Sequence, residues 1–187
     1  MIQDSLVAGN PYEVIYADDI SSSSPVNTLT VKFPANKYDT LHIQMDGYGN
    51  ADNSPRSIYY DLNTTHTWDG NYLYGGLSAS SPVETGDGYS GATYAVLGFN
   101  PWSANFHFSV DHTIHLNPGA NGYITSTGTY MVHRNAAHHL VGSAGNITAT
   151  QTPPVEPTSI TVGLNTAGTS FYGRVKIVGE RRILKGW

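Results

Sequence analysis

Hydrophobic and polar residues alternate with a period of two along much of the chain. In residues 40–46, Leu41, Ile43 and Met45 alternate with polar residues. Because successive side chains of a β-strand point to opposite faces, this pattern predicts strands with one face in a core and the other in solvent. The segments that show it are residues 27–33, 40–46, 57–62, 93–99, 106–116, 123–133, 159–164 and 171–178.

Clusters of Gly, Asn, Ser and Pro separate the predicted strands. The chain has 20 Gly and 10 Pro residues, which are frequent in turns, and one such turn is expected at residues 34–37. The one helical candidate is a short turn within residues 134–141, which Gly142 and Gly145 limit. We therefore predict an all-β fold, an antiparallel β-sandwich of the jelly-roll type or of another Greek-key arrangement.

Length and composition predict one domain. A chain of 187 residues, of which 39% are hydrophobic and 12% charged, is typical of a single domain with a sizeable core. We place the sandwich in residues 25–180, after an amino-terminal arm (1–24) and before a basic carboxy-terminal tail (181–187). No segment approaches the roughly 20 apolar residues of a membrane helix, and residues 1–13 lack the regions of a secretory signal. The absence of Cys excludes disulfides and zinc–thiolate sites.

Charge is distributed unevenly along the chain. Five of the nine Lys and Arg residues lie in residues 174–187, where the only acid is Glu180, so this end carries a net charge of +4 and the rest carries −9. The two parts should attract each other, within one chain or between neighbouring copies. Because the acidic body would repel phosphate groups, nucleic acid is not an expected partner, and a membrane is not expected either.

Three predicted connections, residues 47–55, 64–91 and 142–157, are longer than hairpin turns. Long loops on a rigid sheet scaffold often carry binding functions. The middle connection combines aromatic residues with Gly and Ser, a composition that suits contact surfaces. The candidate interaction residues in this region and shortly after it are Trp68, Tyr72, Tyr74, Tyr89 and Trp102.

Histidine is frequent, with eight residues, but its spacing does not predict a metal site. His107, Asp111 and His115 share one face of a predicted strand, yet each step of four residues spans about 13 Å, too far for one ion. A metal site would need ligands from other strands. His112 lies on the apolar face of the same strand, and we expect it to be a hydrogen-bonded core or interface residue.

The segment DGYGNADN, residues 46–53, is rich in oxygen donors. It lacks the glycine at the sixth position and the closing Glu of an EF-hand loop. We expect an Asx-rich turn here, with a looser calcium site as the alternative. No metal and no cofactor is predicted.

No catalytic motif occurs in the sequence. The G-x-S-x-G pattern, a Cys nucleophile and glycine-rich phosphate loops are all absent. With 14 acidic residues, a carboxylate pair such as Asp61 and Asp69 is no evidence for a glycosidase. We predict that the protein is not an enzyme and has no catalytic residues. The sequons at Asn63 and Asn146 matter only in a glycosylating host.

Three segments carry a resemblance to a known group of proteins. They are LTVKFPANKYDTLHIQMDG (29–47), SIYYDLN (57–63) and SITVGLNTAGTSFYGRVKIVGE (159–180). Their layout resembles that of small virion proteins of tailed bacteriophages. The resemblance implies a non-enzymatic structural protein on the exterior of the virion, assembled in the host cytoplasm, either a capsid decoration (cement) protein or a tail appendage. It also implies a homotrimer.

Two functions from different classes follow as expectations. In the first, the protein contacts copies of itself and the major capsid protein or a tail protein, with Arg181, Arg182 and Trp187 of the tail at the contact. The 13 Tyr residues suit large subunit contacts, because Tyr is enriched at interfaces. In the alternative, the protein is a carbohydrate-binding or host-receptor-binding module, such as the head of a tail fibre, and its partner is a host surface glycan.

Overall fold

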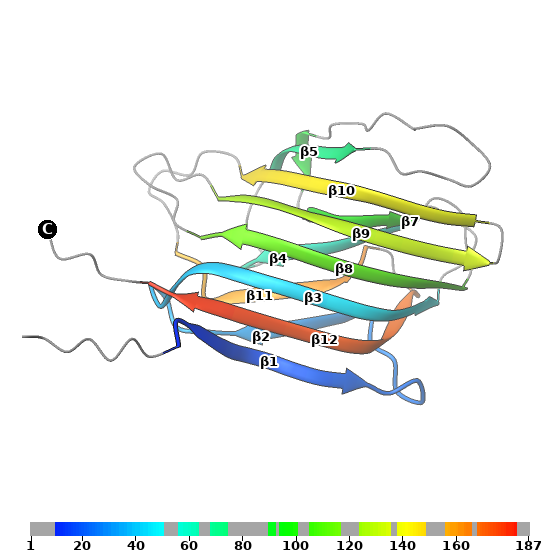
Figure 1. Cartoon of the computed structure of the whole chain (residues 1–187), viewed down its shortest axis with the longest axis horizontal. Helices are drawn as coiled ribbons and strands as arrows, with labels where there is room; N and C mark the ends of the chain where they lie inside the picture. Colours follow the sequence, from blue (N-terminus) through cyan, green and yellow to red (C-terminus); the bar gives the residue numbers. More distant parts are fainter. Residues whose placement is uncertain are drawn as a thin grey trace, which may run out of the picture.

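Two antiparallel β-sheets make up the fold, which we describe from a computed structural model (Figure 1). The structure describes residues 10–50, 56–63, 68–74, 90–92, 94–100, 105–116, 124–135, 138–148, 156–165 and 168–182. All regular elements within these ranges are β-strands. None of the described residues form a helix that could span a membrane. The predicted all-β fold with an antiparallel two-sheet arrangement is confirmed.

The large sheet has eight strands and the small sheet has four. In spatial order the large sheet consists of β1 (Tyr12–Ile20), β12 (Ser170–Arg181), β3 (Tyr38–Asn50), β8 (Asn105–His115), β9 (Thr125–Asn135), β10 (His138–Thr148), β5 (Trp68–Tyr74) and β6 (Ser90–Ala92). The small sheet consists of β2 (Thr28–Lys32), β11 (Ser159–Leu164), β4 (Arg56–Leu62) and β7 (Ala95–Asn100).

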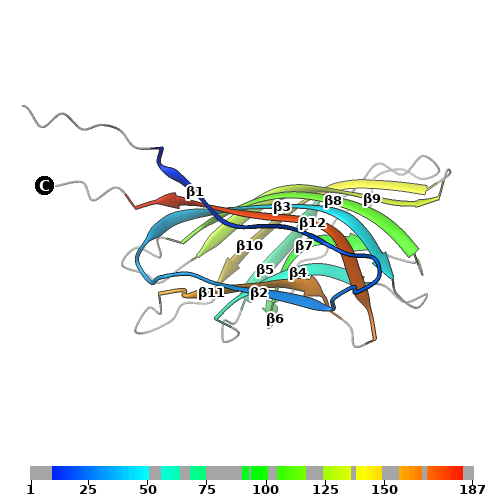
Figure 2. The same cartoon turned by 90° about the horizontal axis from the view of Figure 1, so that it is seen from below.

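The chain passes repeatedly from one sheet to the other, and the two sheets lie as layers (Figure 2). Strands β1, β3, β8 and β12 belong to the large sheet, whereas β2, β4, β7 and β11, which alternate with them, belong to the small sheet. Strands from the two ends of the chain are neighbours: β12 lies between β1 and β3, and β11 lies between β2 and β4. The hairpin β9–β10 and strands β5 and β6 extend the large sheet beyond β8.

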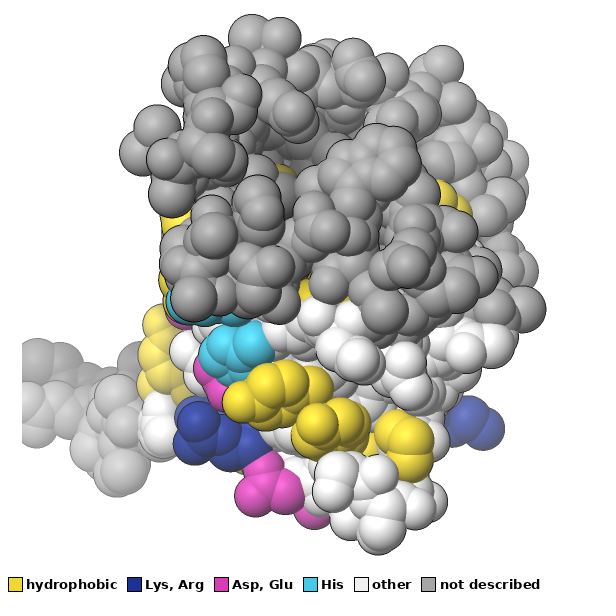
Figure 3. All heavy atoms as spheres, turned by 90° about the vertical axis from the view of Figure 1, so that its right-hand side faces the viewer, with side chains coloured by type: hydrophobic (Ala, Val, Ile, Leu, Met, Phe, Trp, Pro, Cys, Tyr) yellow, Lys and Arg dark blue, Asp and Glu magenta, His cyan; other side chains and the backbone are white. Residues whose placement is uncertain are grey.

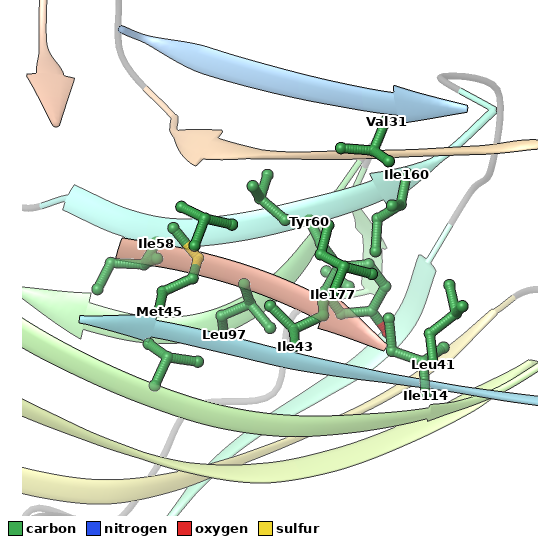
Figure 4. Close-up of a cluster of buried hydrophobic side chains, with 14 of the residues drawn as sticks. Val31, Leu41, Ile43, Met45, Ile58, Tyr60, Leu97, Ile114, Ile160 and Ile177 are labelled. Atoms are coloured by element: carbon green, nitrogen blue, oxygen red, sulfur yellow. The ribbon is translucent and has the colours of Figure 1, made fainter. Parts of the chain in front are cut away.

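The hydrophobic core fills the space between the layers (Figure 4). Leu41 and Ile43 of β3 are fully buried, as are Ile58 of β4 and Ile160 of β11 on the facing sheet. The alternation predicted for residues 40–46 is therefore confirmed. Burial of each such side chain contributes about 1.5–3 kcal/mol, so the facing apolar rows are the main source of stability.

The eight strands predicted from alternation all occur, and the turn at 34–37 is present with Asn36 at a φ of 58°. The prediction of a helical turn within residues 134–141 is wrong, because strands β9 and β10 pair with each other there. The three predicted long connections, 47–55, 64–91 and 142–157, are each wrong in part. Strand β3 continues to residue 50, β5 and β6 lie within residues 64–92, and β10 continues to residue 148.

Tyr130 explains why glycine occurs within β10. A Cβ atom on Gly142 would lie 2.6 Å from the Tyr130 hydroxyl, and one on Gly98 of β7 would lie 2.9 Å from Cγ of the same ring. The buried tyrosine therefore occupies space that only glycine leaves free. The glycines that favoured a loop in the sequence are a packing requirement of a strand.

Parts of both predicted terminal segments belong to the sheet. Strand β1, within the predicted arm, pairs with β12 and has a bulge between Val14 and Tyr16. Arg181 is the last residue of β12, and the backbone N–H of Arg182 donates to the carbonyl of Lys37 (2.9 Å). Residues 1–9 and 183–187 lie outside the described residues.

Candidate functional site

Four aromatic side chains form a row that crosses the strands on the outer face of the large sheet. Tyr172 of β12 is paired in register with Tyr48 of β3, Tyr48 with His107 of β8, and His107 with His133 of β9. The ring centroids of successive members are 5.4, 5.0 and 6.1 Å apart. We call these four residues the aromatic row.

The two tyrosine rings of the aromatic row present their edges to solvent. The planes of Tyr48 and Tyr172 differ by only 19°, so the two rings face each other across the strands and their edges point outward. Tyr48 is 50% exposed. Figure 3 faces the end of the molecule where β3 ends and β12 begins, and it shows hydrophobic side chains next to a His and close to charged groups. Tyrosine rings in this position offer an apolar edge and a hydroxyl to a ligand.

A depression lined mostly by polar and charged residues, which we call the polar depression, adjoins the aromatic row on the same face. Its volume is about 300 Å³. The polar residues that line it, from β3, β8 and β12, are Gln44, Asp46, Ser109, Asp111, Arg174 and Lys176. Asp46 joins the two features, because its Oδ1 lies 3.5 Å from Nε2 of His107 and 3.8 Å from Nη2 of Arg174.

Alternation along β3 puts these groups on the outer face. Gln44, Asp46 and Tyr48 point outward, whereas the intervening Met45 is buried in the core. Gly47 pairs with Gly173, whose φ is 128°, and a Cβ atom on either residue would overlap backbone atoms of the opposite strand. Glycine at both positions therefore lets β3 and β12 approach closely between Tyr48 and Asp46.

The site offers hydrogen-bonding groups next to the apolar edges of aromatic rings. Carboxylate, guanidinium, amide and hydroxyl groups lie side by side on an accessible face, which suits a ligand that has many hydroxyl groups and apolar C–H surfaces. Within the described part of the chain, no group of three or more His, Asp and Glu residues could hold a metal ion.

The aromatic residues predicted from sequence are only partly placed. Trp68, Tyr72 and Tyr74 lie on β5, which pairs with β10, but their side chains are not described. Tyr89, Trp102 and Trp187 lie outside the described residues. Because β10 separates β5 from β9 in the sheet order, these three β5 positions are not next to the aromatic row in the sheet.

Arg181 and Arg182 form ion pairs within their own chain. Nε of Arg181 lies 3.2 Å from Oε2 of Glu13, and Nε of Arg182 lies 2.8 Å from Oδ1 of Asp39. The hydrogen bond from Lys37, with a further contribution from Arg181, lowers the pKa of Glu13. The two arginines therefore hold the end of β12 against β1 and the start of β3.

The histidines on β8 have the predicted orientations. His107, Asp111 and His115 lie on the outer face, whereas His112 is fully buried and its Nε2 lies 2.9 Å from Oγ of Ser126. Burial lowers the pKa of His112 to about 3. The prediction that His112 is a hydrogen-bonded core residue is confirmed.

Neither the oxygen-rich segment nor the sequons form a separate site in the described residues. Residues 46–50 of the segment 46–53 belong to β3, and residues 51–53 lie outside the described part. Asn146 is only 5% exposed and its amide is hydrogen-bonded in the core. The side-chain oxygen of Asn63 accepts hydrogen bonds from the backbone N–H groups of Thr158 and Ser159. Both asparagines have structural roles.

The aromatic row was missed by sequence reasoning because it depends on strand register. Tyr48 fell in a predicted loop, and Tyr172, His107 and His133 lie on three strands whose pairing the sequence does not reveal. The only part of the site that alternation in the sequence indicated was the outward orientation of His107 and Asp46. Comparisons with protein-family models, with curated proteins and with solved structures found no match to this chain.

Proposed function

We propose that this chain is a non-enzymatic saccharide-binding protein of the jelly-roll type on the exterior of a bacteriophage particle. The observation that carries the binding function is the aromatic row, aligned by register over four strands, next to the polar depression. The ligand lies across the strands, with its apolar faces against the ring edges and its hydroxyl groups toward Asp46, Arg174 and Gln44.

Strand order supports the jelly-roll assignment. The four strands β1-β12-β3-β8 face the four strands β2-β11-β4-β7, and chain-end strands are neighbours in both sheets. A jelly roll consists of eight strands in two sheets formed by two Greek keys, and this architecture occurs in viral capsid domains and in lectins. In this assignment β5, β6, β9 and β10 are additions that widen one sheet.

The resemblance to small phage virion proteins supports the location. The protein would then be a decoration protein or a tail appendage, with copies of itself and the major capsid protein or a tail protein as partners. Tyr12 (49% exposed) and Val14 (57% exposed) on β1 offer an apolar surface for such attachment. Immunogold labelling of purified particles tests this location: we expect gold at the head or the tail, and unlabelled particles would contradict it.

The open shape of the site predicts weak binding of single sugars. Each net hydrogen bond contributes about 0.5–1.5 kcal/mol, so a few bonds on an exposed face give a Kd on the order of millimolar. Several sites on one particle would strengthen attachment through multivalency. Binding assays should therefore use oligosaccharides or densely displayed glycans.

Tyr48 and Tyr12 provide a matched test. Both are half-exposed tyrosines of the large sheet, 50% and 49% exposed, but only Tyr48 belongs to the aromatic row. On a dense glycan array followed by calorimetric titration of the best ligand, we expect Tyr48→Ala to weaken binding at least tenfold and Tyr12→Ala to have little effect. Equal losses in both variants would contradict the site, and no binding to any displayed glycan would contradict the function.

A further inference from the structure

Four buried polar residues form the cluster that joins the two sheets. Tyr60 belongs to β4 of the small sheet, and His112, Ser126 and Asn146 belong to β8, β9 and β10 of the large sheet. Their exposure ranges from 0% to 6%. Oγ of Ser126 lies at the centre, 2.6 Å from Tyr60 Oη, 2.9 Å from His112 Nε2 and 3.1 Å from Asn146 Nδ2. We call these residues the buried cluster.

The hydrogen-bond donors and acceptors around Ser126 indicate which ring nitrogen of His112 carries the proton. Tyr60 and Asn146 both donate to Ser126 Oγ, and a hydroxyl oxygen has two acceptor positions. The amide of Asn146 cannot be reversed without loss, because Oδ1 accepts from the N–H of Val96 and Nδ2 also donates to the Val96 carbonyl. The Ser126 hydroxyl therefore donates to His112 Nε2, and His112 is neutral with its proton on Nδ1.

Among the residues that the structure describes, the surroundings of His112 do not stabilise a charge. The groups that face it are Tyr60 from β4, Ser126 and Gly128 from β9, and Ile43 from β3, and none of them is ionised at neutral pH. Asp111 lies on the opposite, solvent face of β8. A Cβ atom at position 128 would overlap the His112 ring, so glycine there makes room for the imidazole. Nδ1 of His112 has no hydrogen-bond partner among the described residues.

We propose that His112 is an acid-sensitive latch between the two sheets. A proton can add only at Nε2, the ring nitrogen that accepts from Ser126. Both groups would then be donors, so the bond at the centre of the buried cluster would break and an unpaired charge would lie in the core. Acidification should therefore weaken the attachment of the two sheets to each other. This inference does not depend on saccharide binding.

The direction of the pH dependence of stability follows from the pKa of His112 in the folded and in the unfolded protein. Burial lowers its pKa to about 3 from the ordinary value of 6.5, so the unfolded chain binds this proton first as the pH falls. The contribution to stability is complete above about pH 6.5 and is lost progressively toward pH 3. Within this window the unfolding equilibrium constant should rise about tenfold per pH unit because of this one residue.

Denaturant unfolding between pH 7.5 and 4.5 tests the latch. His112→Gln can accept from Ser126 without titrating, and His115→Gln, on the exposed face of the same strand, is the matched control. Over two pH units in the window, we expect the unfolding constant of the wild-type protein to rise about 100-fold more than that of His112→Gln. His115→Gln should retain the wild-type dependence. Parallel pH profiles for the wild-type protein and His112→Gln would overturn the proposal.

A measurement on the wild-type protein avoids any failure of the variant to fold. Nitrogen-15 NMR of labelled histidine distinguishes the two neutral tautomers and reports titration. We expect His112 to carry its proton on Nδ1 and to stay neutral in the folded protein down to pH 5. A proton on Nε2, or titration near pH 6 with the fold intact, would overturn the proposal.

Discussion

The side-chain amide of Asn146 takes the place of a neighbouring strand for Val96. Its Oδ1 accepts from the Val96 N–H at 2.9 Å, and its Nδ2 donates to the Val96 carbonyl at 3.0 Å. Val96 belongs to β7, the last strand of the small sheet, which has a neighbouring strand on one side only among the described residues. One buried amide thus satisfies two backbone groups and links β7 to β10 of the large sheet.

Replacement of Asn146 should therefore be costly. In Asn146→Ala the buried N–H and carbonyl of Val96 lose their partner, and we expect the free energy of unfolding to fall by about 2–4 kcal/mol. Denaturant unfolding measures this change. Asn50→Ala, at the exposed end of β3, is the control and should change stability by less than about 0.5 kcal/mol. A similar small change in Asn146→Ala would contradict the role of the amide.

Strands with clear alternation were predictable, and those with irregular composition were not. Strand β10 contains Gly142 and Gly145 and looked like a loop, because the packing of Tyr130 that requires Gly142 is a tertiary contact. Strand β1 was missed because its bulge between Val14 and Tyr16 interrupts the period of two. Local pattern therefore identified eight of the strands, whereas β1, β5, β6 and β10 depended on contacts distant in sequence.

The candidate site was less predictable than the fold. The faces of His107 and Asp46 followed from alternation, but their proximity to Tyr172 depends on the order β12-β3-β8. A shift of one residue in any of these pairings would move the rings to the core face. Sequence reasoning therefore favoured aromatic residues that are close in sequence, such as Tyr72 and Tyr74, over a row formed by register.

The end of β12 allows a comparison of two neighbouring arginines. Arg182 is 21% exposed and its guanidinium donates to Asp39 and Asn36, whereas Arg181 is 56% exposed and pairs with Glu13. We expect Arg182→Met to lower the free energy of unfolding by about 1–2 kcal/mol and Arg181→Met by less than about 0.5 kcal/mol, because solvent screens the second pair. Thermal and denaturant unfolding of both variants measure the difference. Equal losses would show that burial does not distinguish the two contacts.

For the whole molecule, the described sheet edges limit how copies can associate. Strand β1 has a bulge and carries Glu13, Asp18 and Asp19, features that discourage pairing with another strand. The other edges are short or capped, since β2 has five residues, β6 has three, and Asn146 satisfies Val96 of β7. Association through a continuous intermolecular sheet is therefore disfavoured, and subunit contacts should use side-chain surfaces.

The mass of the protein in solution tests the proposed assembly. From the resemblance to virion proteins we expect a trimer, with three times the 20.2 kDa mass of the chain, in light scattering coupled to size exclusion. EDTA should not change this mass, because the described residues contain no cluster of metal ligands. A monomer would contradict the trimeric decoration protein and favour a free-standing binding module. Dissociation by EDTA would instead show that a metal ion holds the subunits together.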